Sequence, residues 1–215
     1  MPEIVRLCGS DPKADFDRLA YLHTTSIFHG VLPLLGKRFL AALYLQIAET
    51  PGAGVWVARQ DSVIVGFVAG CRDMPAAFRH ILARGWVRLA FKAATQLWRP
   101  TVWRKVASLA LYPIRSRSGE RNSDGRTEGS PPEPVEAELL AIAVAASARG
   151  GGVGRRLVEA FEHDLLRPSG VKTYIVTTNW EDTASNSFYR RLGFEPRDSF
   201  KHHDLVLQRY SKSIR

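Results

Sequence analysis

The residues with the clearest chemical potential form a short glycine-rich loop, Arg149-Gly150-Gly151-Gly152-Val153-Gly154. The loop follows a nearly continuous apolar run from Glu138 to Val144, which is typical of a strand covered on both faces. It precedes a segment with apolar residues at helical spacing. Glycines at a helix N-terminus leave several backbone N–H groups open to close approach, and the helix dipole adds positive potential. The expected ligand is therefore a phosphate or pyrophosphate.

Neither of the common nucleotide-binding loops fits this segment. The Walker pattern needs Lys followed by Ser or Thr after the last glycine, but Arg155 and Arg156 stand at those positions. The dinucleotide pattern belongs to a first βαβ unit, whereas this loop lies late in the chain after strands of antiparallel type. Both patterns are disfavoured.

Two motifs in order give the loop a more specific interpretation. Arg149, Gly152 and Gly154 match the pattern Arg/Gln-x-x-Gly-x-Gly/Ala, and Asn186-Ser187-Phe188-Tyr189-Arg190-Arg191-Leu192-Gly193-Phe194 follows about 30 residues later. In these features the chain resembles the GNAT superfamily of acyl-CoA-dependent N-acyltransferases. The resemblance is clear over residues 136–209, extends less distinctly to residues 3–72, and is absent from residues 73–134.

The resemblance implies acetyl-CoA as co-substrate. No cluster of residues has metal-ligand spacing, so no metal is expected. In such folds the strand before the loop splays from its neighbour and offers backbone groups to the pantetheine arm, while the loop holds the pyrophosphate. The cofactor-binding residues implied in this way are Ile142, Ala143, Val144, Arg149, Gly150, Gly151, Gly152, Val153, Gly154, Arg155 and Asn186.

The resemblance also implies a catalytic pair. Tyr189 stands where the family places the phenol that protonates the departing thiolate. The attacking amine must lose a proton, which requires a base. Glu138, six residues before Val144, is the first candidate; a water chain or another residue is the alternative. His29 lies in the region that usually walls the acceptor pocket, and its near-neutral pKa would suit a base or a hydrogen-bond donor.

The element pattern predicts one α/β domain, residues 1–215, with a mixed, mostly antiparallel sheet flanked by helices. A basic helical insertion and a flexible loop, residues 73–134, precede the cofactor-binding strand. The expected strands and helices are strands 3–7, 54–59, 63–71, 138–144, 171–178 and 201–209, and helices 15–28, 37–49, 75–98, 153–165 and 183–192.

The charge is strongly positive and unevenly distributed. Of the net +9, the segment from Asp73 to Tyr112 supplies six charges. The helix expected at 75–98 has three interpretations: a lid with solvated charges, a peripheral contact with the inner membrane face, or a contact with an anionic acceptor. Nucleic-acid binding is not expected, because no recognition motif accompanies the charge.

The sequence leaves several alternatives open. The leading function is transfer of an acetyl or small acyl group to a primary amine, with an amino sugar as one candidate acceptor. The alternative is an acyl-CoA-binding or membrane-surface module without turnover. Two cysteines without metal-ligand spacing and the lack of a signal-like or membrane-spanning apolar run favour a reducing, cytoplasmic setting. The sequence does not specify the oligomeric state.

Overall fold

The computed structural model describes residues 1–27, 32–94, 137–202 and 205–214; the side chains of residues 85–94 and of His202 are outside the description. The described residues form one mixed sheet in the order β1-β2-β3-β4-β5-β7-β6, in which β4 and β5 are parallel and the other neighbours antiparallel. The strands are β1 Glu3–Leu7, β2 Ala53–Gln60, β3 Val63–Cys71, β4 Ala137–Val144, β5 Thr173–Asn179, β6 Glu195–His202 and β7 Leu205–Ser213.

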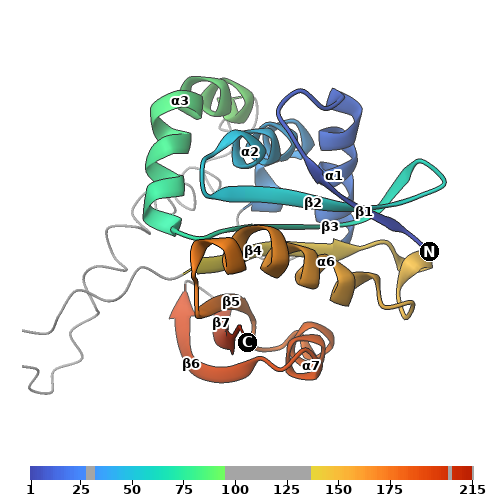
Figure 1. Cartoon of the computed structure of the whole chain (residues 1–215). Helices are drawn as coiled ribbons and strands as arrows, with labels where there is room; N and C mark the ends of the chain where they lie inside the picture. The colour runs from blue at the N-terminus through green and yellow to red at the C-terminus, as the bar shows by residue number, and fades with distance from the viewer. Residues whose placement is uncertain (28–31, 95–136, 203–204, 215) are drawn as a thin grey trace, which may run out of the picture.

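Helices cover both faces of this sheet (Figure 1). On one face, α1 (Lys13–Ser26) and α2 (Lys37–Glu49) pack over β2 and β3. On the other face, α6 (Val153–Phe161) and α7 (Thr183–Arg191) enclose a second core around Leu157 and Tyr174. The expected α/β class, with a mostly antiparallel sheet flanked by helices, is confirmed.

The β2–β3 hairpin shows how local sequence sets the register. Asp61 and Ser62 both have positive φ, the conformation that a two-residue hairpin turn with the twist of the strands requires. The two strands show little alternation of apolar and polar residues, because both faces of β2 and β3 are buried. The hairpin expected at 54–59 and 63–71 is confirmed.

The end of the chain differs from the expectation of a single strand at 201–209. Two strands, β6 and β7, form an antiparallel hairpin there. The first was missed because its sequence, Glu-Pro-Arg-Asp-Ser-Phe-Lys-His, is polar and largely exposed, so no apolar alternation marks it. Antiparallel backbone pairing with β7 holds β6 in the sheet.

The basic helix is described only in part. Helix α3 runs over Met74–Ala94, with Ala77 buried against the α1–α2 core and Arg79 and Arg84 exposed. The flexible loop expected around 115–134 lies outside the described residues. Among the helices that are described, none is both long enough and apolar enough to cross a membrane.

Candidate functional site

An opening between two parallel strands is the main feature of the site. Strand β4 pairs with β5 only over Ala137–Leu139, opposite Tyr174–Val176. Within the described part of the chain, no strand pairing joins residues 140–144 to β5, which pairs with β7 on its other edge. Such unpaired backbone is a template for an extended ligand. The splayed strand expected from the resemblance is present.

A β-bulge at Leu140 starts this opening. Leu139 pairs with Gly70 and Ala141 with Ala69, so one residue of β4 has no partner on β3. Leu140 and Ala141 consequently both pack toward the α1–α2 face. The bulge breaks the simple alternation of β4. It directs Ile142 and Val144 to the α6–α7 face, where both contact the second core.

The glycine-rich loop lies at the end of the opening. A short 3₁₀ turn, Ala146–Ala148, leads from β4 into it, and Gly152 caps α6 in the left-handed conformation with φ of 76°. Open space surrounds Gly150 and Gly152 where a Cβ would point. The Arg149 side chain donates to the carbonyl oxygen of Val144 at 3.0 Å, which fixes the loop to the strand. This geometry fits an anion bound by backbone N–H groups.

Helix α7 packs directly on this loop. A Cβ at Gly154 would meet the Phe188 ring at 2.9 Å, so close contact between the two helices requires glycine there. Asp182 caps α7 by accepting from the Ser185 backbone N–H at 3.0 Å. The packing therefore places the start of α6 against the middle of α7.

Asn186 has a different environment from the one expected. Its amide donates to the carbonyl oxygens of Asn179, Trp180 and Asp182, and its Oδ1 accepts from the Tyr210 hydroxyl at 2.9 Å. Residues two apart on a helix are about 200° apart, so Asn186 points almost opposite to Phe188. These contacts give Asn186 a role in holding the β5–α7 connection, and its contact with the cofactor stays a prediction.

Tyr189 lies in the core beneath α7. Its ring contacts Phe188, Phe194 and Tyr210, with centroids 5.3 to 6.1 Å apart. Burial, with a further contribution from Asp182, raises the pKa of the Tyr189 phenol well above its ordinary value of 10. The phenol is therefore protonated at neutral pH, as a proton donor must be.

Glu138 lies in the short paired stretch of β4 directly before the opening, and its side chain is on the face of the sheet opposite to Tyr189. Its strand neighbours Ala137 and Leu139 belong to the α6–α7 core, so alternation directs Glu138 to the α1–α2 face. There it pairs with Cys71. Burial and the nearby Glu138 carboxylate raise the pKa of the Cys71 thiol to about 12. Glu138 and Tyr189 thus flank the sheet from opposite sides.

The α1–α2 face also holds a buried polar pair that the sequence did not reveal. His23 Nδ1 lies 2.5 Å from the Tyr44 hydroxyl, and the Tyr44 ring packs edge-on against Phe67, whose strand partner on β4 is Ala143. Among the described residues, His23 Nε2 has no hydrogen-bond partner although the side chain is 2% exposed. Burial lowers the pKa of His23 to about 4. His29 lies outside the described residues.

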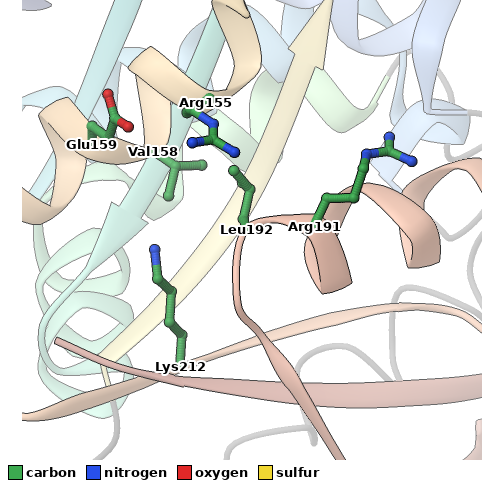
Figure 2. A pocket seen from close by; sticks show the side chains of 6 residues that line it. All are labelled: Arg155, Val158, Glu159, Arg191, Leu192 and Lys212. Atoms are coloured by element: carbon green, nitrogen blue, oxygen red, sulfur yellow. The ribbon is translucent and has the colours of Figure 1, made fainter.

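A small hollow lies beside the loop, on the α6–α7 face. It has a volume of about 100 Å³ and is lined by Arg155, Val158, Glu159, Arg191, Leu192 and Lys212 (Figure 2). Arg155 was expected at the site because it directly follows the glycine loop in the sequence. Arg191 and Lys212 were missed because only the folded chain brings α6, α7 and β7 together.

No metal centre is evident in the part of the chain that the structure describes. Nowhere there do three His, Cys, Asp or Glu side chains come together in a group that could hold an ion. The site described above consists of backbone donors, a phenol, a carboxylate and cationic side chains.

Comparison with known proteins agrees with this geometry. Residues 119–196 match the model of the acetyltransferase (GNAT) domain family. A search of curated proteins gave no match. Among solved structures, an acetyltransferase of the GNAT family from Desulfovibrio desulfuricans aligns at 16% identity over 99% of each chain, with a TM-score of 0.58.

Two further structures share the fold. Ard1 from Thermoplasma volcanium aligns at 14% identity, covering 99% of this chain and 97% of that chain, with a TM-score of 0.58. The ribosomal-protein-S18-alanine N-acetyltransferase from Escherichia coli aligns at 13% identity, covering 100% and 94%, with a TM-score of 0.56. At these identities the likeness is one of fold.

The family match over residues 119–196, the fold and the opening that ends at a glycine loop all point to one class of enzyme. Residues 119–196 match the acetyltransferase (GNAT) domain family, and the described residues have the fold of solved GNAT acetyltransferases. An acetyl-CoA-dependent N-acetyltransferase of the GNAT type is the class of enzyme that this part of the chain resembles.

Proposed function

We propose that this protein transfers the acetyl group of acetyl-CoA to a primary amine that reaches the opening between β4 and β5 from the α1–α2 face. The observation that carries the proposal is the limited β4–β5 pairing, which leaves residues 140–144 unpaired toward β5. The unpaired stretch ends at the glycine loop, where Gly150 and Gly152 leave space for a phosphate group. An extended pantetheine arm and a pyrophosphate fit these two parts in sequence.

The proposed roles of Arg149 and Val144 follow from one contact. The guanidinium donates to the Val144 carbonyl oxygen and so fixes the end of β4 against the loop. The N–H groups of Gly150 to Arg155 would bind the pyrophosphate, while the Arg149 charge adds positive potential. Ile142, Ala143 and Val144 would meet the arm through their backbone.

Proton transfer would run across the sheet. The amine nitrogen attacks the thioester carbonyl carbon, the carbon–sulfur bond then breaks, and the sulfur takes a proton from the Tyr189 phenol. Burial of Tyr189 keeps that proton in place until the thiolate forms. The proton lost by the amine goes to Glu138, directly or through water, on the opposite face. Because the proton donor Tyr189 and the proton acceptor Glu138 lie on opposite sides of the thioester, Tyr189 does not lose its proton directly to Glu138.

The acceptor is a primary amine, with amino sugars as the first compounds to examine. The segment Leu35-Gly36-Lys37-Arg38-Phe39-Leu40, together with a helical insertion after the third strand, looks similar to GNAT proteins encoded near bacterial surface-polysaccharide genes, which favours this class. The N-acetyltransferases of similar fold include one named for a ribosomal-protein alanine, so acceptor amines on peptides belong in the same test.

A panel of acceptors with acetyl-CoA tests the proposal. Amino sugars, nucleotide-linked amino sugars, polyamines and peptides are incubated with the enzyme, thiol release is followed, and mass spectrometry confirms an added acetyl group. The proposal expects acceptor-dependent thiol release that is lost in Tyr189→Phe. Tight acetyl-CoA binding with no turnover on any class of amine would instead favour a binding module.

A further inference from the structure

Three buried side-chain nitrogens in the described part of the chain have no hydrogen-bond partner: His23 Nε2, Asn179 Nδ2 and Arg209 Nε. His23 and Asn179 are only 2% and 6% exposed. An unpaired polar atom in the interior costs about 1–3 kcal/mol, and each one in a folded protein needs an explanation. A polar group that binds a substrate is one such explanation.

These three nitrogens share the α1–α2 face of the sheet, from which the amine is proposed to arrive. His23 lies on α1 and is packed against α2. In β7, Tyr210 faces the α6–α7 core, so alternation directs Arg209 to the opposite face. Val176 of β5 also faces the α6–α7 core, and Asn179, three residues further along, therefore faces away from it.

Arg209 lies beside the start of the opening between β4 and β5. It pairs with Thr177, and Thr177 is the first residue of β5 beyond the stretch that pairs with β4. Adjacent strands are about 4.8 Å apart, so Arg209 is one strand away from the edge of the opening. Asn179 is two residues beyond Thr177 and on the same face. His23 is held separately by α1, which packs over β3 and β4, so the two donors on the sheet carry the inference.

The contacts of Arg209 hold its guanidinium in place without using Nε. Nη1 lies 3.4 Å from Oδ2 of Asp198, which is half exposed. The guanidinium also lies over the Phe200 ring, 5.2 Å from its centroid. Nε–H and the neighbouring Nη2 form an edge with which arginine can bind a carboxylate through two parallel hydrogen bonds.

Asn179 offers a neutral donor on the same face. Its Oδ1 accepts from the Glu181 backbone N–H at 3.1 Å, which leaves Nδ2 to donate. Because Asp198 offsets part of the Arg209 charge, the two donors suit the single charge of a carboxylate. A phosphate monoester, with about −1.5 to −2 charge at pH 7, would be repelled more strongly by Asp198.

We propose that Arg209 and Asn179 bind a carboxylate of the acceptor, so that the enzyme acetylates amines that carry a carboxylate a few carbon atoms from the nitrogen. The inference rests on the proposed function, because it concerns the acceptor of the same reaction. Both residues act on specificity: they bind the end of the acceptor that does not react and take no part in proton transfer.

Acetyl transfer by the full chain to matched pairs of acceptors tests this inference. The pairs are ω-amino acids of increasing length, from glycine to aminohexanoate, and their carboxamides, which keep the amine and the length but lack the charge. Glucosamine and glucosamine 6-phosphate form a further pair that tests phosphate. The measured preference is kcat/KM for the acid divided by kcat/KM for its amide. Comparing this ratio between a variant and the wild type cancels both a general loss of activity and the different basicity of the two amines.

Three variants separate carboxylate binding from a structural role. Arg209→Gln removes the proposed binding group. Asp198→Asn removes the ion-pair partner but keeps the guanidinium, so it should change the preference in the opposite direction. Arg190→Gln is the matched control, because it removes the same charge from an exposed position on α7, on the other face of the sheet.

The wild type should prefer the best acid to its amide by at least about tenfold, as a hydrogen bond to a charged group supplies. Arg209→Gln should lower the preference to under about threefold, mainly by raising KM for the acid, with little change in kcat/KM for the amide. Asp198→Asn should raise the preference, because the repulsion of the carboxylate is gone. Arg190→Gln should leave it unchanged.

Turnover of amines without any preference for the acid would overturn the inference and leave acetyl transfer standing. A preference for glucosamine 6-phosphate over glucosamine and over every amino acid would do the same. Equal losses of preference in Arg209→Gln and Asp198→Asn would also overturn it, because they would show that the ion pair only supports the fold. If the wild type acetylated no amine at all, the proposed function itself would fall, and the inference with it.

Discussion

The two faces of the central sheet differ in the charge of their buried polar pairs. On the α1–α2 face, His23 and Tyr44 form a neutral pair, because burial lowers the pKa of His23 to about 4 and raises that of Tyr44. On the α6–α7 face, Glu162 and Lys212 form an ion pair with N and O 2.7 Å apart. The buried pair on the α1–α2 face is therefore neutral, whereas the buried pair on the α6–α7 face is charged.

This difference matches the two substrates proposed for the site. The cofactor is an anion, and the face toward α6 and α7 offers it the glycine loop together with Arg155 and Lys212. The attacking amine must be neutral, and a wall without a protonated histidine offers it no competing charge. The opening between β4 and β5 connects the two environments.

Replacement of the proposed acid should have the largest effect. Tyr189→Phe removes only the hydroxyl from a ring that keeps its contacts with Phe194 and Tyr210. Turnover should fall about 10²- to 10⁴-fold, while acetyl-CoA affinity changes little. Steady-state kinetics and calorimetry measure the two quantities separately. Wild-type kcat in the variant would assign thiolate protonation to another group.

Breaking the ion pair on the α6–α7 face should destabilise the fold. Lys212 and Tyr174 both donate to the buried Glu162 carboxylate. Lys212→Met removes the first of these donors and leaves the second. The free energy of unfolding should fall by about 3 kcal/mol, measured by urea denaturation at pH 7. The double variant Glu162→Gln, Lys212→Met should recover much of that loss, because the uncompensated charge is gone. A double variant as unstable as Lys212→Met would assign the loss to packing.

The neutral pair on the α1–α2 face should appear in the pH dependence of stability. The pKa of His23 is about 4 in the folded chain, against an ordinary 6.5. As pH falls, the unfolded chain binds the proton first. The free energy of unfolding is therefore undiminished above pH 6.5 and loses about 3 kcal/mol from this group toward pH 4.

The His23→Gln variant isolates that contribution from the titration of carboxylates. Its free energy of unfolding should fall less steeply than that of the wild type between pH 6.5 and 4. Urea unfolding curves at several pH values give both slopes. Parallel slopes would mean that the pKa of His23 is the same in the folded and unfolded chains, which would contradict a neutral buried pair.

Removal of the proposed base should have a smaller effect that depends on pH. Glu138→Gln should lower kcat/KM by about 10²-fold at neutral pH. Part of the activity should return at higher pH, because the acceptor amine then loses its proton in solution. A constant loss across the pH range would indicate that Glu138 positions the acceptor instead.

The sequence predicted those parts of the site that consist of continuous segments. The apolar run of β4, the glycines and the α6 stripe are local patterns. The bulge at Leu140 was not predictable, because Leu-Leu-Ala-Ile-Ala-Val has no alternation that a bulge could interrupt. The contact between Lys212 and Glu162 joins residues 50 positions apart. The exposed strand β6 lacks the apolar pattern by which a strand is recognised.

The central claim is that the glycine loop binds the pyrophosphate of acetyl-CoA, and a pair of variants at Gly151 tests it most directly. A Cβ there would meet only the Ala148 carbonyl oxygen, at 3.9 Å, so a side chain fits without strain. Gly151→Glu adds a charge that Gly151→Gln lacks. A close like-charge pair near a surface costs about 4 kcal/mol, so calorimetry should show at least about 100-fold weaker acetyl-CoA binding in Gly151→Glu than in Gly151→Gln. Equal affinities in the two variants would contradict the account.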